Sequence, residues 1–389
     1  MGTVLLSPGG LVQDRNMTPR TAPPFRADHV GSLLRPPALH EARESFTKGA
    51  ISAEELRAVE DDAIRGAVEM QRSAGLKSAT DGEFRRSAWH MDFIYQLHGI
   101  EKSDERLHVK FHNAAGDIEF SPSGLKVVDK VGLDRVIFGE HFGFLKSIVE
   151  PSVTPKQTIP SPSMVYYRGG RAAVDETVYP DLEEFYDDLA KAYARQVAGL
   201  AEAGCTYLQL DDTSLAYLND PEQRALVARM GGDPDKQHLR NIKTMNAALA
   251  GKPAGLTVTT HLCRGNFRSS WVAEGGYDFV ADALFNELDV DGYFLEFDDE
   301  RSGGFEPLRF VPKGKYVVLG LVTTKRGELE SVDSLRQRID AASKFVDIEQ
   351  LCLSPQCGFS STEEGNDLTE AEQKAKLERI VETAALVWG

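Results

Sequence analysis

Residues 181–212 read DLEEFYDDLAKAYARQVAGLAEAGCTYLQLDD, and this stretch decides the fold class. Its first part has the apolar spacing of an amphipathic helix, with Asp181 as the N-cap and Gly204 at the end. The apolar run at 206–210 predicts a short buried strand that is followed by two carboxylates. A helix followed directly by such a strand is the repeating unit of α/β proteins with a parallel sheet.

The same alternation runs through most of the chain. Another helix is predicted from the Ser52 cap to Gly75, and a last one through EAEQKAKLERIVETAALV near the end. About eight strands alternating with helices predict a (β/α)8 TIM barrel, and an open doubly wound sheet is disfavoured because no GxGxxG follows the first strand. The expected strands are Phe25–Val30, Gly75–Thr80, Gln157–Pro160, Thr206–Leu210, Leu256–Cys263, Gly292–Phe297, Tyr316–Val322 and Leu351–Ser354.

Two segments depart from this alternation. Residues 1–24 are rich in Gly, Pro, Thr and Arg without periodicity, which predicts a disordered N-terminal tail. The stretches HVKFHN, DIEFSP and LKVVDKVG within about 100–146 predict antiparallel hairpins packed beside the barrel. We therefore expect residues 25–389 to form a single β/α barrel with an inserted β-hairpin segment at about 100–146.

Composition excludes several classes of protein. The 389 residues include 44 Lys+Arg and 60 Asp+Glu, a formal net charge of −16, which disfavours nucleic acid as a partner. No apolar run approaches the length of a membrane span, and the first residues lack the pattern of a secretion signal. Only four cysteines are present, too few for a disulfide scaffold, so we expect a cytoplasmic protein with free thiols. Oligomer formation is left open.

Residues able to bind a metal follow several expected strands. In TVTTHLC, His261 and Cys263 are two residues apart on one strand and so point to the same side. Glu296 and Cys357, from two later strand ends, complete a possible tetrahedral site, for which Zn²⁺ is the expected ion. The alternative is a hydrogen-bonded core histidine with inert buried thiols, the interpretation that we favour for Cys205 and Cys352.

Carboxylates form a second group at the strand ends. Glu83, Asp211, Asp212 and Asp81 either cap turns or, beside a metal, hold the amine of a substrate. Gly31 and Ser32 follow the first expected strand, where their backbone N–H groups suit a carboxylate, although a plain tight turn explains Gly31 equally well.

The segments HVGSLLRP, TDGEFRR, YLQLDD, HLCRGN, YFLEFDD, LGLVTTK and LSPQCG together resemble the C-terminal catalytic barrel of the cobalamin-independent methionine synthase family, from about residue 25 to the end. The resemblance implies a zinc site at His261, Cys263, Glu296 and Cys357. It also implies that homocysteine contacts Val30, Gly31 and Ser32, with Glu83 and Asp211 as the catalytic acidic pair that holds its amino group. The implied reaction is methyl transfer to the homocysteine thiol, giving methionine.

Two departures from the family pattern concern the methyl donor. Full-length members have an additional N-terminal barrel that helps to bind polyglutamyl folate, and their catalytic histidine falls on Thr323 here, which cannot supply a proton near neutral pH. Folate, a methyl-corrinoid or its carrier protein, and a small methylated metabolite therefore remain as donors. Two other functions remain: a zinc-dependent epoxyalkane:coenzyme M transferase and a non-catalytic zinc-stabilised barrel. A uroporphyrinogen-type decarboxylase is disfavoured, because it needs a cationic pocket for the many carboxylates of its substrate, whereas the strand ends here are acidic.

Overall fold

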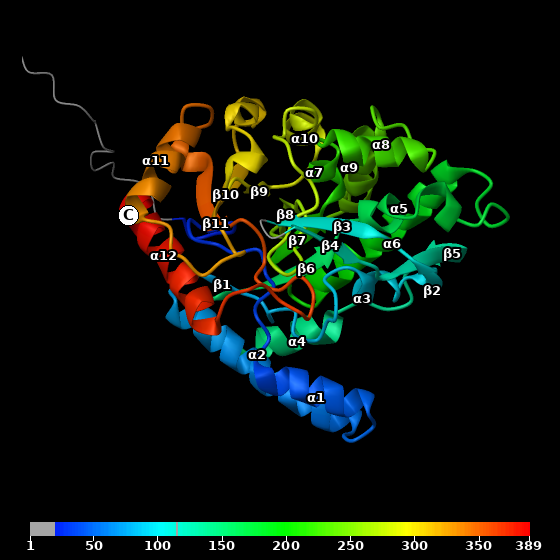
Figure 1. Cartoon of the computed structure of the whole chain (residues 1–389), viewed down its shortest axis with the longest axis horizontal. Helices are drawn as coiled ribbons and strands as arrows, with labels where there is room; N and C mark the ends of the chain where they lie inside the picture. The colour runs from blue at the N-terminus through cyan, green and yellow to red at the C-terminus, as the bar shows by residue number, and fades with distance from the viewer. Residues whose placement is uncertain (1–19, 114–115) are drawn as a thin grey trace, which may run out of the picture.

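The computed structural model describes residues 20–113 and 116–389, and its centre is one curled parallel sheet (Figure 1). Each strand pairs in parallel with the next one along the sheet, in the order β1-β6-β7-β8-β9-β10-β11. This confirms the predicted α/β class and a TIM-barrel-like sheet. The strands are β1 (Ser78–Ala79), β6 (Thr154–Pro160), β7 (Tyr207–Asp212), β8 (Thr257–Leu262), β9 (Gly292–Glu296), β10 (Tyr316–Val322) and β11 (Leu351–Pro355).

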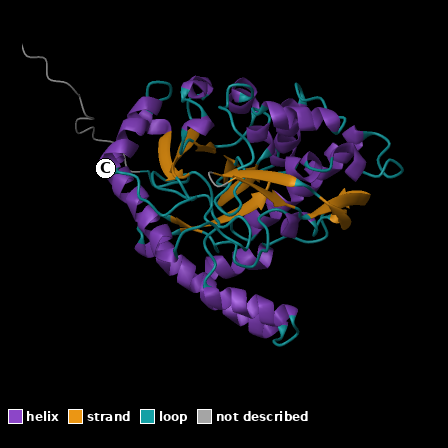
Figure 2. Cartoon of the chain, in the orientation of Figure 1, coloured by secondary structure: helices purple, strands orange, loops and turns teal. Residues whose placement is uncertain are grey.

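Helices cover the outside of the sheet (Figure 2). The predicted caps are confirmed: Ser52 forms a capping box with Glu55, and Asp181 accepts the N–H of Glu183. The helices are α1 (Pro37–Thr47), α2 (Ala53–Ser73), α3 (Met91–Ile94), α4 (Gly139–Ile148), α5 (Ser163–Tyr167), α6 (Leu182–Glu202), α7 (Ser214–Tyr217), α8 (Pro221–Arg229), α9 (Gln237–Leu249), α10 (Ala281–Glu287), α11 (Val332–Ala342) and α12 (Glu370–Trp388), with 3₁₀ turns η1 (Gly170–Ala173), η2 (Glu300–Ser302), η3 (Glu306–Phe310) and η4 (Ile348–Gln350).

The first expected strand, Phe25–Val30, is not a regular strand. It contacts β11 through a single parallel bridge, in which Asp28 donates to the Leu353 carbonyl at 3.0 Å and Leu353 donates to the Arg26 carbonyl at 2.8 Å. Beyond that bridge, side chains take over the role of a neighbouring strand. The carbonyls of residues 29, 30 and 31 accept hydrogen bonds from Lys156 Nζ, Gln209 Nε2 and Thr80 Oγ1 at 2.5, 2.7 and 2.6 Å.

The segment after β1 carries two antiparallel strand pairs. β2 (His98–Arg106) pairs with β5 (Ser123–Gly132), and β3 (Val109–Asn113) pairs with β4 (Gly116–Phe120). The end of the expected insertion, near residue 146, falls within the helix α4 (Gly139–Ile148), whose Phe142 and Leu145 are buried. The β3–β4 pair extends in front of the sheet (Figure 1), where His112 and Trp271 exchange backbone hydrogen bonds of 2.6 and 2.9 Å.

Residues 1–19 of the predicted disordered tail lie outside the described residues. For residues 20–24 the prediction is wrong, because Pro24 is buried and the Arg20 guanidinium donates to the Pro23 carbonyl at 2.6 Å and lies 3.4 Å from the centre of the Tyr316 ring. Among residues 20–113 and 116–389, none of the helices combines the length and apolar character that crossing a membrane requires.

Candidate functional site

Four possible metal ligands converge where β8, β9 and β11 end. His261 is on β8 and Cys263 directly follows it, Glu296 is the last residue of β9, and Cys357 lies two residues beyond β11. One ligand atom from each side chain lies within 4.8 Å of all the others, and all four residues are buried. The strand register explains this meeting, since His261 pairs with Phe294 across the β8–β9 ladder, two residues before Glu296.

The polar atoms of this cluster have the unsatisfied character of a metal site. Neither ring nitrogen of His261 makes a conventional hydrogen bond, and the Cys357 thiol is the group that faces the ring. Glu296 accepts the Arg264 N–H at 2.8 Å through Oε1, but Oε2 has no hydrogen-bond partner. A buried polar group normally has a partner, so a hydrogen-bonded core histidine does not describe His261. The four donor atoms fit a metal ion.

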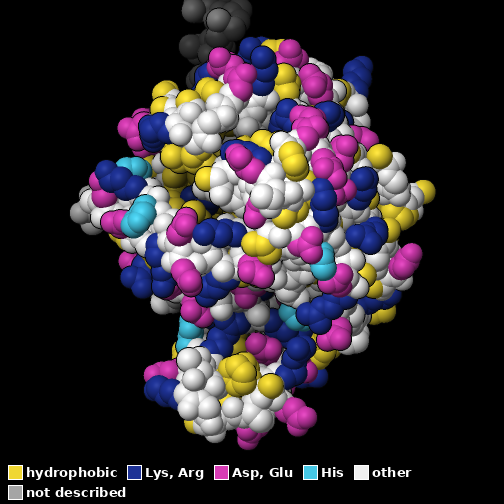
Figure 3. All heavy atoms as spheres, turned by 90° about the vertical axis from the view of Figure 1, so that its right-hand side faces the viewer, with side chains coloured by type: hydrophobic (Ala, Val, Ile, Leu, Met, Phe, Trp, Pro, Cys, Tyr) yellow, Lys and Arg dark blue, Asp and Glu magenta, His cyan; other side chains and the backbone are white. Residues whose placement is uncertain are grey.

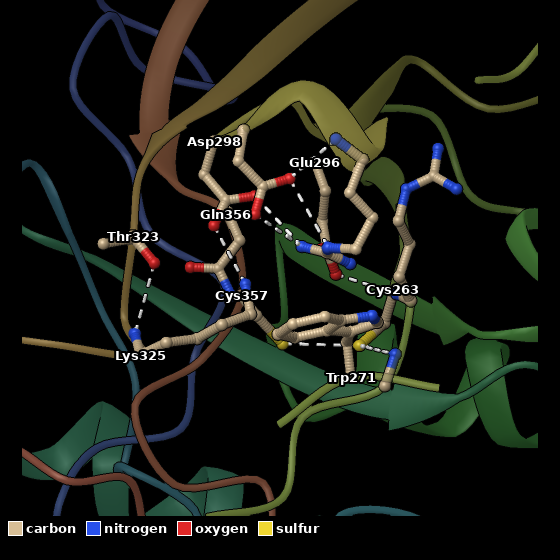
Figure 4. Close-up of polar contacts among 12 residues, drawn as sticks. Cys263, Trp271, Glu296, Asp298, Thr323, Lys325, Gln356 and Cys357 are labelled. Carbon is tan, nitrogen blue, oxygen red and sulfur yellow. Dashed lines mark hydrogen bonds and ion pairs between the residues drawn. The ribbon is translucent and has the colours of Figure 1, made fainter. Parts of the chain in front are cut away.

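The two thiols are in hydrogen-bond contact. Their sulfur atoms are 3.4 Å apart (Figure 4), and the hydrogen bond from Cys263 holds the pKa of Cys357 well below its ordinary value despite burial. The same contact, with burial, raises the pKa of Cys263 well above its ordinary value. Two ionised thiolates at this distance require a cation between them, because a second buried negative charge is otherwise too costly.

A salt-bridge network lies behind Glu296. Asp298 pairs with Lys325 at 2.9 Å and with Arg301 at 3.4 Å. Thr323 belongs to this network and not to the pocket: its N–H donates to Glu330 at 2.8 Å, and its hydroxyl accepts the Lys325 N–H at 3.3 Å. Figure 4 shows Thr323 and Lys325 in this arrangement.

Glu83 and Asp211 face the same pocket as three of the four ligands, His261, Cys263 and Cys357. Glu83 has a left-handed backbone with φ of 62°, accepts the Thr158 hydroxyl at 2.7 Å, and pairs with Arg86 at 3.3 Å. Asp211 accepts Gln209 Nε2 at 2.6 Å. Burial raises the pKa of Asp211 to about 7; His261 opposes this shift, and the nearby Glu83 carboxylate adds to it. Two buried carboxyl groups near one another favour a cationic ligand.

The other two predicted carboxylates have structural roles. Asp81 accepts the Glu83 N–H at 2.9 Å and so forms the turn after β1. Asp212 is fully buried and accepts the Ser161 hydroxyl at 2.5 Å, the Ser214 hydroxyl at 2.7 Å and the Leu215 N–H at 2.8 Å. Its oxygens are therefore occupied by the protein. The structure thus separates two adjacent residues: Asp211 faces the pocket, and Asp212 is a buried hydrogen-bond acceptor at the start of α7.

Residues 30–32 form a seat of free amide groups at the pocket wall. Within the described part of the chain, the N–H groups of Gly31 and Ser32 donate to no protein acceptor. Gly31 has φ of +146°, and a Cβ there would lie 2.7 Å from Thr158 Cγ2, so only glycine fits without a shift. Val30, Ser32 and the acidic pair line one pocket together.

This pocket encloses about 730 Å³, including its open mouth, and aromatic rings cover much of it. Phe111 of β3 and Phe120 of β4 contact Phe267, with ring centroids 5.4 and 4.4 Å from that of Phe267. The antiparallel β3–β4 pair therefore supplies an apolar cover opposite the polar floor.

Sequence reasoning did not assign several residues of this site. Trp89 and His90 stack on each other at 4.3 Å and line the pocket. Gln209 could have been found, because it lies two residues before Asp211 on the same face of the strand. Arg168 could not, because it lies in a loop between α5 and η1 with no motif around it.

Comparison with known proteins gives the same assignment. The family model described as "Cobalamin-independent synthase, Catalytic domain" matches residues 154–385. The uncharacterized protein YxjH of Bacillus subtilis is 47% identical over 366 residues, covering 94% of this chain and 95% of YxjH. The chain belongs to the cobalamin-independent methionine synthase family.

Two further relatives of this family match nearly the whole chain. A methionine synthase of Pyrococcus abyssi is 25% identical over 362 residues, covering 90% of this chain and 91% of that protein. A solved structure from Listeria monocytogenes, described as a candidate vitamin-B12-independent methionine synthase, is 38% identical with a TM-score of 0.76 and covers 95% of this chain and 100% of its own. The chain is accordingly a methyltransferase that acts on a thiol.

Proposed function

We propose that this protein is a zinc-dependent methyltransferase that converts homocysteine to methionine. The observation that carries the proposal is the convergence of three elements at one pocket. They are the four-ligand cluster, which lines the pocket through His261, Cys263 and Cys357; the acidic pair Glu83 and Asp211; and the free amides of Gly31 and Ser32, of which Ser32 lines the pocket. Homocysteine has a thiol, an ammonium and a carboxylate, and each element is complementary to one of these groups.

Zinc fits the donor set best. Two thiolates are soft ligands, and imidazole and carboxylate are both common on zinc, with zinc–sulfur distances of about 2.3 Å. Structural zinc sites are closed, mostly with cysteine and histidine, so a carboxylate such as Glu296 favours a catalytic site. Zinc bound here would ionise a substrate thiol near neutral pH, where a free thiol is mostly protonated.

The side chains of the protein orient the amino acid. Glu83 and Asp211 hold the ammonium group, and this contact lowers the cost of burying two carboxylates side by side. The amides of Gly31 and Ser32 hold the carboxylate of homocysteine in a charge-assisted hydrogen-bonded seat. The aromatic cover of Phe111, Phe120 and Phe267 excludes water from the thiol, which preserves it for attack on the methyl group.

The loop after β10 restricts the class of donor. Thr323 supplies no imidazole, and its hydroxyl is engaged in the Lys325 turn. Tetrahydrofolate leaves as an amine anion that must be protonated, whereas a methyl-corrinoid releases its methyl group without taking up a proton. We therefore favour a donor that needs no acid at position 323, and a methyl-corrinoid, free or on a carrier protein, meets that requirement.

Elemental analysis with zinc-edge X-ray absorption tests the proposal directly. We expect one zinc per chain, with a sulfur count that rises from two to three when homocysteine is added. Absence of zinc, or a sulfur count unchanged by homocysteine, would overturn the proposal and leave a zinc-stabilised barrel or another chemistry. Coenzyme M serves as the contrasting thiol, because its sulfonate should be repelled by Glu83 and Asp211. A rise in sulfur count with coenzyme M alone would instead support the epoxyalkane transferase function.

A further inference from the structure

A second cavity adjoins the pocket of the four ligands and shares a wall with it. It encloses about 580 Å³, including its open side, between the β2–β5 strands and the loop that joins α5 to η1. His90 and Arg168 line both cavities, so these two side chains separate one space from the other. No role described above for the pocket uses this space.

The charged groups of this second cavity are mostly basic. Arg106, Lys126 and Arg168 line it, and Glu105 is the carboxylate that faces them. Glu105 is already paired with Lys126 at 3.0 Å. Two arginines are therefore left to determine the charge of the cavity, in a chain whose net charge is −16.

Neither arginine has a carboxylate partner among the described residues. The Arg106 guanidinium donates to the Ser121 carbonyl at 3.2 Å, and that of Arg168 lies 5.9 Å from the centre of the Tyr217 ring. Arg171, three residues later and outside this cavity, shows the more usual arrangement, since it pairs with Glu176 at 3.5 Å. An arginine that lines a cavity without a carboxylate partner, as the exposed Arg106 and the half-buried Arg168 do, is a ready site for carboxylate or phosphate.

The outer surface around the cavity does not favour anions over cations. Figure 3 faces the side of the molecule that carries β2, β5 and α5, and basic and acidic side chains are interspersed over it. At the shared wall, the positive charge of Arg168 lies near His90, whose pKa is lowered to about 3 mainly by burial and in part by Arg168. The attraction for an anion is thus local to the cavity.

We propose that this second cavity binds the oxyanionic tail of the methyl donor, a carboxylate or phosphate group held between Arg106 and Arg168. The methyl-bearing end of the same molecule then reaches the four-ligand pocket past the wall formed by His90 and Arg168. The assignment of the ligand as the donor rests on the proposed function, whereas anion binding in the cavity does not. Carboxylates and a phosphodiester share this chemistry, and the probes below distinguish them.

Calorimetric titration of the zinc-loaded protein at low salt tests the proposal with two probes, inorganic pyrophosphate and a triglutamate peptide. We expect at least one probe to bind, and Arg106→Gln and Arg168→Gln each to weaken its binding by about tenfold or more, as expected for loss of a charge-assisted hydrogen bond. Lys102→Gln is the matched control, because it removes the same charge from the same strand outside the cavity. The probe that binds identifies the tail as phosphate or carboxylate.

Three results would overturn the proposal: no binding of either probe, equal weakening by Lys102→Gln, or a raised KM for homocysteine in Arg168→Gln with unchanged probe binding. The last result would place Arg168 in the thiol site. Zinc content and the homocysteine-dependent sulfur count are measured on the same samples. If zinc is absent or the sulfur count does not change with homocysteine, while probe binding still depends on the two arginines, the proposed function is wrong and the anion-binding cavity stands.

Discussion

The two sides of the pocket are built in different ways. On the metal side, the ligands are at or just beyond the ends of β8, β9 and β11, whose parallel pairing positions them through the backbone. On the amino-acid side, residues 29–32 belong to no strand, and the side chains of Lys156, Gln209 and Thr80 hold the carbonyl groups of residues 29–31. Backbone pairing tolerates most side-chain changes, whereas the amino-acid side depends on individual side chains. Substitutions should therefore impair zinc binding and homocysteine binding separately.

The largest effect is expected on the metal side. Cys357→Ser removes one of the two sulfur ligands, and we expect loss of stoichiometric zinc and a fall in methyl transfer of more than about 100-fold, since even residues that only support metal ligands commonly contribute 10- to 100-fold. Zinc content and turnover are measured together. Cys352→Ala is the control, because that thiol is buried among Val30, Phe294 and Val318. Normal turnover in a zinc-free variant would refute the metal-dependent function.

The next effect is expected at the acidic pair. Asp211→Asn removes one of the two charges proposed to hold the ammonium group, so the KM for homocysteine should rise by about tenfold to a hundredfold, the range for a hydrogen bond to a charged group. Zinc content should not change. Steady-state kinetics with homocysteine as the varied substrate measures the effect, and an unchanged KM would remove Asp211 from the binding site.

The neighbouring residue provides the contrast. Asp212→Asn disturbs a carboxylate that accepts bonds from Ser161, Ser214 and the Leu215 N–H. We expect the free energy of unfolding to fall by about 1–3 kcal/mol, with the KM nearly unchanged. Denaturant unfolding measures the loss. A large KM effect with full stability would show that the roles of the two aspartates are reversed.

The difference between the metal side and the amino-acid side of the pocket also explains how much of the site could be predicted from the sequence. Strand ends follow from apolar runs and turn residues, so the positions of His261, Cys263, Glu296 and Cys357 at one edge of the sheet were predictable from strand periodicity and order. The seat at 30–32 was expected from its position after the first strand and from a family resemblance, but its irregular backbone was not. Periodicity cannot show that Lys156 and Gln209, from later strands, replace a backbone ladder with side-chain hydrogen bonds.

The inserted segment was the least predictable part of the site. Alternating residues in HVKFHN and DIEFSP indicated hairpins, but nothing in them indicated what the hairpins would contact. The contact of Phe111 and Phe120 with Phe267 joins residues about 150 positions apart in sequence, and the Arg106–Arg168 cavity joins a strand to a distant loop. Such pairings depend on tertiary packing, which local propensity does not determine.

Gly31→Ala tests how strictly the seat requires its backbone shape. The φ of +146° and the 2.7 Å approach of a Cβ to Thr158 Cγ2 make alanine costly, by about 1–3 kcal/mol in unfolding free energy. Because the segment would have to shift, the KM for homocysteine should rise while zinc content stays constant. Gly251→Ala is the control, since a Cβ at that position meets no atom within 4 Å. Equal effects of the two substitutions would contradict a special role for Gly31.

The smallest effect is expected where the seat is held only indirectly. Gln209 donates to the Val30 carbonyl at 2.7 Å and to Asp211 at 2.6 Å, so it connects the carboxylate seat to the acidic pair. Gln209→Met should leave zinc bound, reduce the unfolding free energy by about 1–2 kcal/mol, and raise the KM for homocysteine a few-fold.

Gln157→Met is the matched comparison, because Gln157 is a buried glutamine on the adjacent strand β6 whose amide donates to the Thr158 carbonyl at 2.9 Å. It should lose similar stability without a change in KM. A KM change shared by the two variants would mean that general loosening of the sheet, and not the Gln209 link, sets the affinity for the amino acid. A KM change confined to Gln209→Met would show that this one side chain couples the carboxylate seat to the acidic pair. On this side of the pocket, backbone pairing does not provide that link.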